Sequence, residues 1–177
     1  VVVPCYNEEE AIPYFYNEIN KVSNTMNSNA EFEFLFVNDG SKDNTLTVLR
    51  ELSKKDNRVK YLSFSRNFGK EIAMIAGLDY ATGDCVIFMD ADLQDPPELI
   101  PELVKYWEEG YDDVYAKRRS RKGETWLKKF TSKMYYKVLQ HLTKVEIQKD
   151  TGDFRLLDRR CVNALRKLRE SQRNTKS

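Results

Sequence analysis

Several classes of protein are excluded by what this sequence lacks. Its 177 residues contain no long apolar run, and the mean hydropathy is −0.65, so no transmembrane helix is expected within them. With 29 Lys and Arg against 28 Asp and Glu, the chain lacks the basic excess of a general nucleic-acid binder. Three widely spaced cysteines give no metal-ligand spacing, and we interpret them as small buried residues of a protein from a reducing compartment. The single histidine, His141, is interpreted as a solvated helix residue.

Short apolar runs and helical patterns alternate along the chain. This alternation predicts a single α/β domain with a Rossmann-like, mostly parallel sheet and helices on both faces. The expected strands are residues 1–3, 32–37, 59–64, 84–89 and 113–116. The expected helices are residues 9–26, 45–55, 69–82 and 99–107.

Polar residues follow the first three expected strands, at the sheet edge where ligands of parallel sheets bind. Tyr6 offers a flat face to a nucleobase and Glu8 an acceptor for ribose hydroxyls, although a helix cap at Asn7 explains the same segment equally well. Asp39 is placed to accept an N–H group of a base. Lys70 follows Gly69 at a helix start, which is a weak signal for phosphate.

The fourth strand end is the sharpest signal. If the chain stays extended, Asp90, Asp92 and Gln94 share one side. Two carboxylates and an amide oxygen suit Mg²⁺ or Mn²⁺, with a diphosphate completing the shell. Asp95, which precedes Pro96, is interpreted as a helix cap. Later, Asp153 and Arg155 share a side of another extended stretch, where a salt-bridged edge strand is the simpler explanation.

The net charge of the chain is close to zero, but two blocks of opposite charge lie within it. Residues 84–113 hold ten acids, and residues 117–133 hold eight Lys or Arg. Residues 124–142 have the pattern of an amphipathic helix with lysines on its polar side. Such a helix fits an anionic membrane surface or the protein core, and the pattern leaves both open.

Taken together, the segments Pro4–Glu8, Val37–Ser41, Asp90–Gln94 and Gly152–Arg155 resemble the family-2 inverting glycosyltransferases of GT-A fold. Their order and spacing are most similar to the polyprenyl-phosphate glycosyltransferases, such as bactoprenol glucosyltransferase and dolichyl-phosphate mannose synthase. The resemblance implies transfer of a sugar from a nucleotide-sugar, preferably a UDP-sugar, to a polyprenyl phosphate, with inversion and with Mg²⁺ or Mn²⁺.

The resemblance also implies a role for each matching residue. Asp90, Asp92 and Gln94 would hold the metal, Asp153 and Arg155 would be catalytic, and Arg118, Arg119 and Arg121 would meet the acceptor phosphate. The nucleotide-sugar would contact Pro4, Tyr6, Asn7, Glu8, Asp39, Lys70, Asp90, Ala91 and Asp92. A phosphate acceptor has a second pKa of about 6 and is largely ionised at neutral pH, so Asp153 acts either as a base or as a positioning group.

These implications extend to the organisation and location of the protein. We expect one catalytic domain over residues 1–170, with a nucleotide-binding half (1–95), an acceptor-side half (96–170) and a tail (171–177). Because the chain starts inside an apolar run without Met, we expect a piece of a longer protein, anchored to the cytoplasmic face of a membrane by missing C-terminal residues. The oligomeric state stays open, with a homo-oligomer as one alternative. Transfer to a sugar hydroxyl and a non-catalytic nucleotide-sugar-binding domain also stay open.

Overall fold

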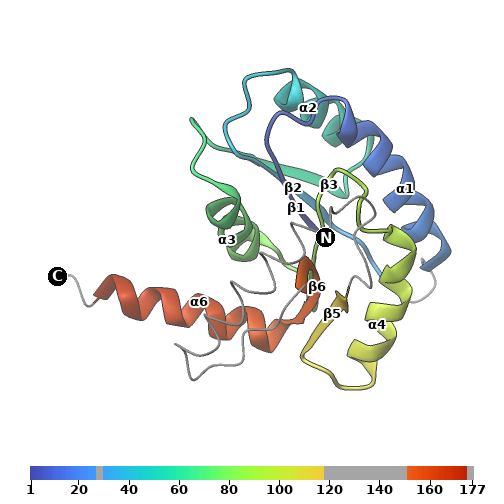
Figure 1. Ribbon diagram of the computed structural model, residues 1–177, viewed down its shortest axis with the longest axis vertical. Helices are drawn as coiled ribbons and strands as arrows, with labels where there is room; N and C mark the ends of the chain where they lie inside the picture. Colours follow the sequence, from blue (N-terminus) through green and yellow to red (C-terminus); the bar gives the residue numbers. More distant parts are fainter. Residues whose placement is uncertain (27–29, 118–150, 175–177) are drawn as a thin grey trace, which may run out of the picture. The chain divides into compact units, whose positions relative to one another are not determined.

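The computed structural model describes residues 1–26, 30–117 and 151–174. Within these residues, six strands form one sheet in the order β3-β2-β1-β4-β6-β5 (Figure 1). The strands are β1 (Val2–Cys5), β2 (Phe34–Asn38), β3 (Val59–Ser63), β4 (Cys85–Phe88), β5 (Asp113–Lys117) and β6 (Thr151–Asp158). Neighbours among the first four are parallel, whereas β6 is antiparallel to β4. The predicted α/β class with a mostly parallel sheet is therefore confirmed.

Helices cover both faces of this sheet. They are α1 (Ala11–Met26), α2 (Thr45–Lys55), α3 (Lys70–Tyr80), the 3₁₀ helix η1 (Pro97–Leu99), α4 (Ile100–Glu108) and α6 (Arg159–Asn174). Helix α1 packs with α2 and α4, and α3 packs with α6 on the opposite face (Figure 1). The bounds of α2 match the sequence prediction, and those of the other expected elements differ from it by one or two residues at one or both ends.

The core lies on both sides of the central strands. All five residues of β2 are buried, as expected of a strand covered on both faces. On one face, Phe15 of α1 meets Phe36 edge to face. On the other, Gly77 of α3 lies so close to β1 that a Cβ atom there would be 2.2 Å from Cγ1 of Val2. This close approach fixes α3, and with it Lys70, against the strand that leads into the candidate site.

The C-terminal part differs most from expectation. The chain continues after β6 as α6, a helix that is not among those expected from the sequence and that reaches into the expected tail. Its guanidinium groups bind carbonyl oxygens at the end of α3 and in the next turn: Arg166 binds those of Leu78 and Ala81, and Arg159 binds that of Gly83. These contacts add to the apolar contacts of Val162, which is buried in the core.

Packing divides the chain into two units, Val1–Tyr115 with Asp153–Ser177, and Ala116–Gly152. The predicted amphipathic helix at 124–142 and the predicted phosphate-binding arginines, Arg118, Arg119 and Arg121, lie outside the described residues. Among the residues that are described, no helix is both long and apolar enough to cross a membrane.

Candidate active site at the carboxyl edge of the sheet

The ends of β1, β2 and β4 and the start of α3 enclose a cavity of about 400 Å³. It is lined by Pro4, Cys5, Tyr6, Glu8, Asp39, Asn67, Gly69, Lys70, Ala73, Asp90, Ala91 and Asp92. Eight of the nine residues predicted to contact the nucleotide-sugar are in this lining. The exception is Asn7. The sequence prediction does not include the remaining lining residues, Cys5, Asn67, Gly69 and Ala73.

The segment after β1 is tied to the segment after β2. Asn7 adopts a left-handed conformation, with φ of 57°, which asparagine tolerates better than most residues. Its backbone N–H donates to Oγ of Ser41 at 2.9 Å, and its Oδ1 accepts the N–H of Lys42 at 2.8 Å. Asn7 therefore joins two loops rather than lining the cavity, and it does not cap α1, which begins at Ala11. Tyr6, with 40% exposure, remains open to a ligand.

Asp39 is almost fully buried at the end of β2. Its Oδ1 accepts the backbone N–H of Phe68 at 2.7 Å, and its Oδ2 accepts that of Gly69 at 2.9 Å. A carboxylate has about four lone-pair sites, so these two bonds leave room for a further donor from the cavity. Asp39 thus lines the cavity and also holds the loop that precedes α3.

Lys70 crosses the cavity to Asp90. Its Nζ lies 2.6 Å from Oδ1 and 2.7 Å from Oδ2 of Asp90. Both side chains are partly exposed, which leaves them accessible to a ligand. The sequence suggests phosphate for Lys70 and a metal for Asp90, but gives no sign that the two meet.

The cavity is strongly acidic around this pair. Burial and, after it, the carboxylates of Asp92, Asp90 and Asp43 raise the pKa of Glu8. In the described part of the chain no group of three or more His, Cys, Asp or Glu side chains is arranged to hold a metal. Asp90 and Asp92 would therefore supply two oxygen-bearing groups and leave other positions to a ligand such as a diphosphate, which fits the chemistry of Mg²⁺ or Mn²⁺.

The segment after β4 is a turn and not an extended strand. Leu93 has φ of 56°, and Oδ1 of Asp92 accepts the N–H of Gln94 at 3.0 Å. The alternation expected for Asp90, Asp92 and Gln94 therefore ends at this turn, and Gln94 is absent from the residues that line the cavity. The cap preceding η1 is Pro96 and not, as expected, Asp95.

Strand β6 brings the last predicted segment to the same sheet. Arg155 pairs with Phe88 of β4. Asp153 comes two residues before Arg155, and because the two strands are antiparallel it lies toward the end of β4 from which the chain continues to Asp90. The Asp153 side chain lies outside the described residues. Nη1 of Arg155 is 3.6 Å from Oδ2 of Asp113, so Arg155 is salt-bridged as considered from the sequence, but β6 lies between β4 and β5 and is not the expected edge strand.

Cys5 lines the cavity but is not a nucleophile. Burial, before all other causes, raises the pKa of its thiol to about 12. A thiol is reactive as its thiolate, so at neutral pH this group stays protonated and inert. It behaves as the small buried residue expected from the sequence.

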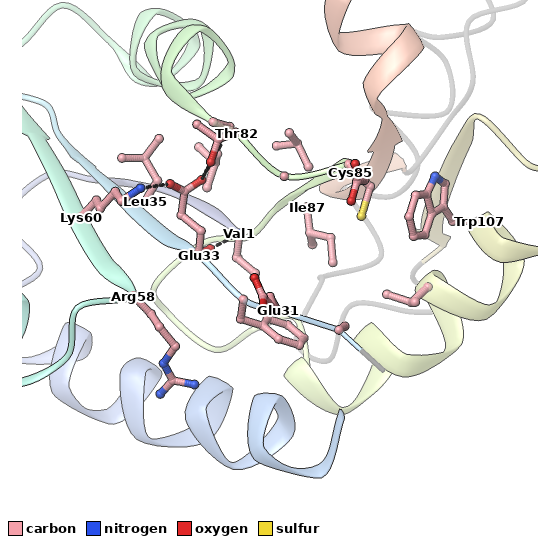
Figure 2. A pocket seen from close by; sticks show the side chains of 18 of the residues that line it. Val1, Glu31, Glu33, Leu35, Arg58, Lys60, Thr82, Cys85, Ile87 and Trp107 are labelled. Carbon is pink, nitrogen blue, oxygen red and sulfur yellow. Dashed lines mark hydrogen bonds and ion pairs between the residues drawn. The ribbon is translucent and has the colours of Figure 1, made fainter. Parts of the chain in front are cut away.

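A larger cavity, of about 700 Å³, lies at the opposite edge of the sheet, where the strands begin (Figure 2). Glu33 is central to it and pairs with Lys60 at 2.6 Å and with the N–H of Thr82 at 3.1 Å. Among the described residues, none from the four polar strand-end segments lines this cavity. We therefore assign the chemistry to the smaller one.

The chain is similar to known glycosyltransferases. An uncharacterized glycosyltransferase of Synechocystis sp. is 52% identical over 173 residues, which are 98% of this chain and 54% of that protein. The prophage bactoprenol glucosyl transferase homolog of Escherichia coli is 45% identical over 170 residues, which are 96% of this chain and 55% of that protein. The chain thus spans about half the length of these curated relatives.

A solved structure shares the fold. A mannosyltransferase of Pyrobaculum calidifontis, in complex with GDP-Man and Mn²⁺, has a TM-score of 0.63 at 20% identity, covering 93% of this chain and 45% of that one. The GT-A fold expected from the sequence is confirmed. The family model described as glycosyl transferase family 2 matches residues 1–166, and the chain therefore belongs to that family.

Proposed function

We propose that this domain transfers a sugar from a nucleotide-sugar, preferably a UDP-sugar, to a polyprenyl-phosphate carrier with inversion at the anomeric carbon. The observation that carries the proposal is the cavity in which Asp90 and Asp92 lie beside Lys70 at the carboxyl edge of the sheet. The acceptor is inferred from the bactoprenol glucosyl transferase homolog, which is 45% identical over most of this chain.

The cavity has a base end and a diphosphate end. Tyr6 and Asp39 offer a ring face and a hydrogen-bond acceptor to the nucleobase. Asp90 and Asp92 would hold Mg²⁺ or Mn²⁺, which when bound neutralises charge on the departing diphosphate. Lys70 adds a positive charge at the same end.

The acceptor needs orientation more than deprotonation. A lipid phosphate is already an anion at neutral pH, so Asp153 serves as a positioning group rather than as a proton acceptor. The side chains of Arg118, Arg119 and Arg121 would bind this phosphate, for which the planar guanidinium is well suited. The reaction would then take place at the cytoplasmic face of a membrane, where such a lipid presents its headgroup.

A donor panel tests the proposal. Thermal unfolding is followed with UDP-glucose, other UDP-sugars and GDP-mannose, each with and without Mn²⁺. We expect one class of nucleotide to raise the Tm by about 6 °C at roughly 100 times its Kd, and only with the metal. If no nucleotide-sugar shifts the Tm, the donor assignment is wrong. If only GDP-mannose does, the preference for UDP is wrong.

A further inference from the structure

The loop before α3 is held on the end of β2 by backbone contacts. The two oxygens of Asp39 accept the N–H groups of Phe68 and Gly69. Next to it, Gly40 has φ of 64°, and a Cβ atom there would be 2.2 Å from the carbonyl carbon of Arg66. The loop therefore has little freedom to shift away from Asp39 while these contacts persist.

This loop sets the place of Lys70. Lys70 directly follows Gly69 as the first residue of α3, and the helix is fixed further along by the close approach of Gly77 to Val2. From this position the Lys70 ammonium contacts both oxygens of Asp90. A chain of contacts thus runs from Asp39, at the base end of the cavity, to Asp90, at the diphosphate end.

The Lys70 ammonium is paired with the carboxylate of Asp90, which a divalent cation would also bind. Without a cation, Asp90, Asp92 and Glu8 place negative charges around one cavity, and Lys70 offsets part of that charge. A divalent cation on Asp90 must compete with this ammonium. A nucleotide diphosphate supplies new oxygens to which the displaced ammonium can turn.

We propose that Lys70 is an exchangeable counter-ion that sits on Asp90 in the empty cavity and on the diphosphate in the filled one, with Asp39 as the residue that positions it. The inference rests on the proposed function, because it takes the ligand to be a nucleotide diphosphate with a divalent cation. It makes cation and nucleotide binding cooperative, since each removes an obstacle to the other.

Binding of Mn²⁺ alone tests the first part of the proposal, that Lys70 competes with a cation for Asp90 in the empty cavity. The signal of free Mn²⁺ in electron paramagnetic resonance is titrated with wild-type protein and with Lys70→Met, without nucleotide. We expect Lys70→Met to bind Mn²⁺ about fivefold more tightly, which is the scale of a partly exposed ion pair. Lys60→Met is the matched control, because Lys60 also pairs with a carboxylate, that of Glu33, at the other edge of the sheet.

Binding of UDP tests the second part of the proposal, that Lys70 contacts the diphosphate in the filled cavity. UDP affinity is measured by calorimetry in the presence of Mn²⁺. We expect Lys70→Met to bind UDP more weakly than wild type, so that binding of Mn²⁺ and binding of UDP are less strongly coupled in the variant. An unchanged or weaker Mn²⁺ affinity in Lys70→Met overturns the exchange. An equal gain of Mn²⁺ affinity in Lys60→Met also overturns it, because the effect would then reflect net charge alone.

The role of Asp39 is tested by Asp39→Asn. An amide oxygen still accepts one N–H, but the amide nitrogen faces the other N–H, so the loop loosens. We expect a gain in affinity for Mn²⁺ alone, and no further gain when Asp39→Asn is added to Lys70→Met. A residue that only contacts the base would leave the binding of Mn²⁺ alone unchanged, and that result overturns the positioning role. If Asp39→Asn does not fold, by far-ultraviolet circular dichroism, the same comparison is made with Gly40→Ala, which disturbs the loop from the adjacent residue.

Failure of this inference and failure of the proposed function are distinguishable. Wild type that binds UDP and transfers sugar, with no change in Mn²⁺ affinity in Lys70→Met, contradicts only the exchange. Wild type that binds Mn²⁺ but no nucleotide in any assay contradicts the proposed function. Absence of Mn²⁺ binding in both wild type and Lys70→Met contradicts the exchange directly.

Discussion

Asp90 and Asp92 differ in how the protein holds them. Asp90 is partly buried and paired with Lys70, whereas Asp92 is exposed and accepts the N–H of Gln94 within its own turn. A partly buried carboxylate close to the end of a strand has a more defined position than an exposed one on a turn, whichever cation it binds. We therefore expect Asp90 to contribute more than Asp92 to binding of a metal and diphosphate.

Asp90→Asn should remove most of the stabilisation by a nucleotide-sugar with Mn²⁺. Removing the charge weakens the hold on the cation, and transfer should fall by at least about 100-fold, as when other groups that stabilise a developing charge are lost. Thermal unfolding and a transfer assay measure the two effects. Asp84→Asn is the control, because Asp84 is an exposed aspartate at the opposite end of β4. Equal losses in both variants would contradict the assignment.

Gly40→Ala should destabilise the fold through a clash as well as through backbone strain. Gly110→Ala is a matched control, since Gly110 also has positive φ, 104°, but a Cβ atom there would meet nothing within 4 Å. We expect Gly40→Ala to lower the free energy of unfolding in urea by about 2 kcal/mol more than Gly110→Ala. Equal effects would show that the contact with Arg66 carries no cost.

The sequence identifies most of the residues in the cavity but few of their contacts. Asp39 and Lys70 follow strand ends and are recognisable as candidates from that place alone. The partners of Asp39 are backbone N–H groups about 30 residues later, which no side-chain pattern reports. The pattern misplaces Gln94 because the left-handed turn at Leu93 has no signal such as Gly or Asn.

Among the elements, the strands and helices of the first half are expected from the sequence, whereas α6 is not, although its apolar and charged residues segregate to different sides of the helix. Val162 is buried without any exposure, and seven of the 16 residues of α6 are charged. The helix is anchored in part by Arg166 and Arg159, whose partners are carbonyl oxygens at the end of α3 and in the turn after it. Such contacts depend on the fold and leave no period in the sequence.

Arg166→Met should destabilise the packing of α6 on α3. The variant keeps an apolar stem but leaves the carbonyl oxygens of Leu78 and Ala81 without their guanidinium donor, at an expected cost of about 1–2 kcal/mol. Urea unfolding measures the change. Lys167→Met, at the exposed neighbouring position, should change stability by less than about 0.5 kcal/mol. A loss of equal size at both positions would count against the contact.

Acid should weaken the junction of α1, α2 and β3. Hydrogen bonds from Arg58, before all other causes, lower the pKa of Asp56 to about 2, and the hydroxyl of Tyr16 also donates to it at 2.8 Å. Because the folded pKa lies below the unfolded value of 3.8, this stability is complete above about pH 4 and is lost as the pH falls through about 2.

Asp56→Asn should therefore flatten the pH dependence of unfolding between about pH 4 and 2, by about 2 kcal/mol at most. Some dependence should persist, since a hydrogen bond from Trp107, first among several causes, also lowers the pKa of Asp158 to about 2. Urea unfolding of wild type and Asp56→Asn at several pH values measures this pH dependence. An unchanged slope in the variant would show that Asp56 is not the group responsible.

At the scale of the whole molecule, the near-zero net charge is the sum of an acidic block and a basic block. The acidic block includes Asp90 and Asp92 in the cavity, and the basic block includes Arg118, Arg119 and Arg121, proposed for the acceptor phosphate. The chain belongs to glycosyl transferase family 2 and spans about half the length of its curated relatives.

Transfer of a labelled sugar into a lipid is the most direct measurement. The protein is incubated with labelled UDP-glucose, Mn²⁺ and undecaprenyl phosphate in detergent, and the organic phase is counted. We expect label in the organic phase only when donor, metal and lipid phosphate are all present, and loss of that label in Asp90→Asn. Label that appears instead on a sugar-hydroxyl acceptor, or no transfer by a protein that binds the donor, would contradict it.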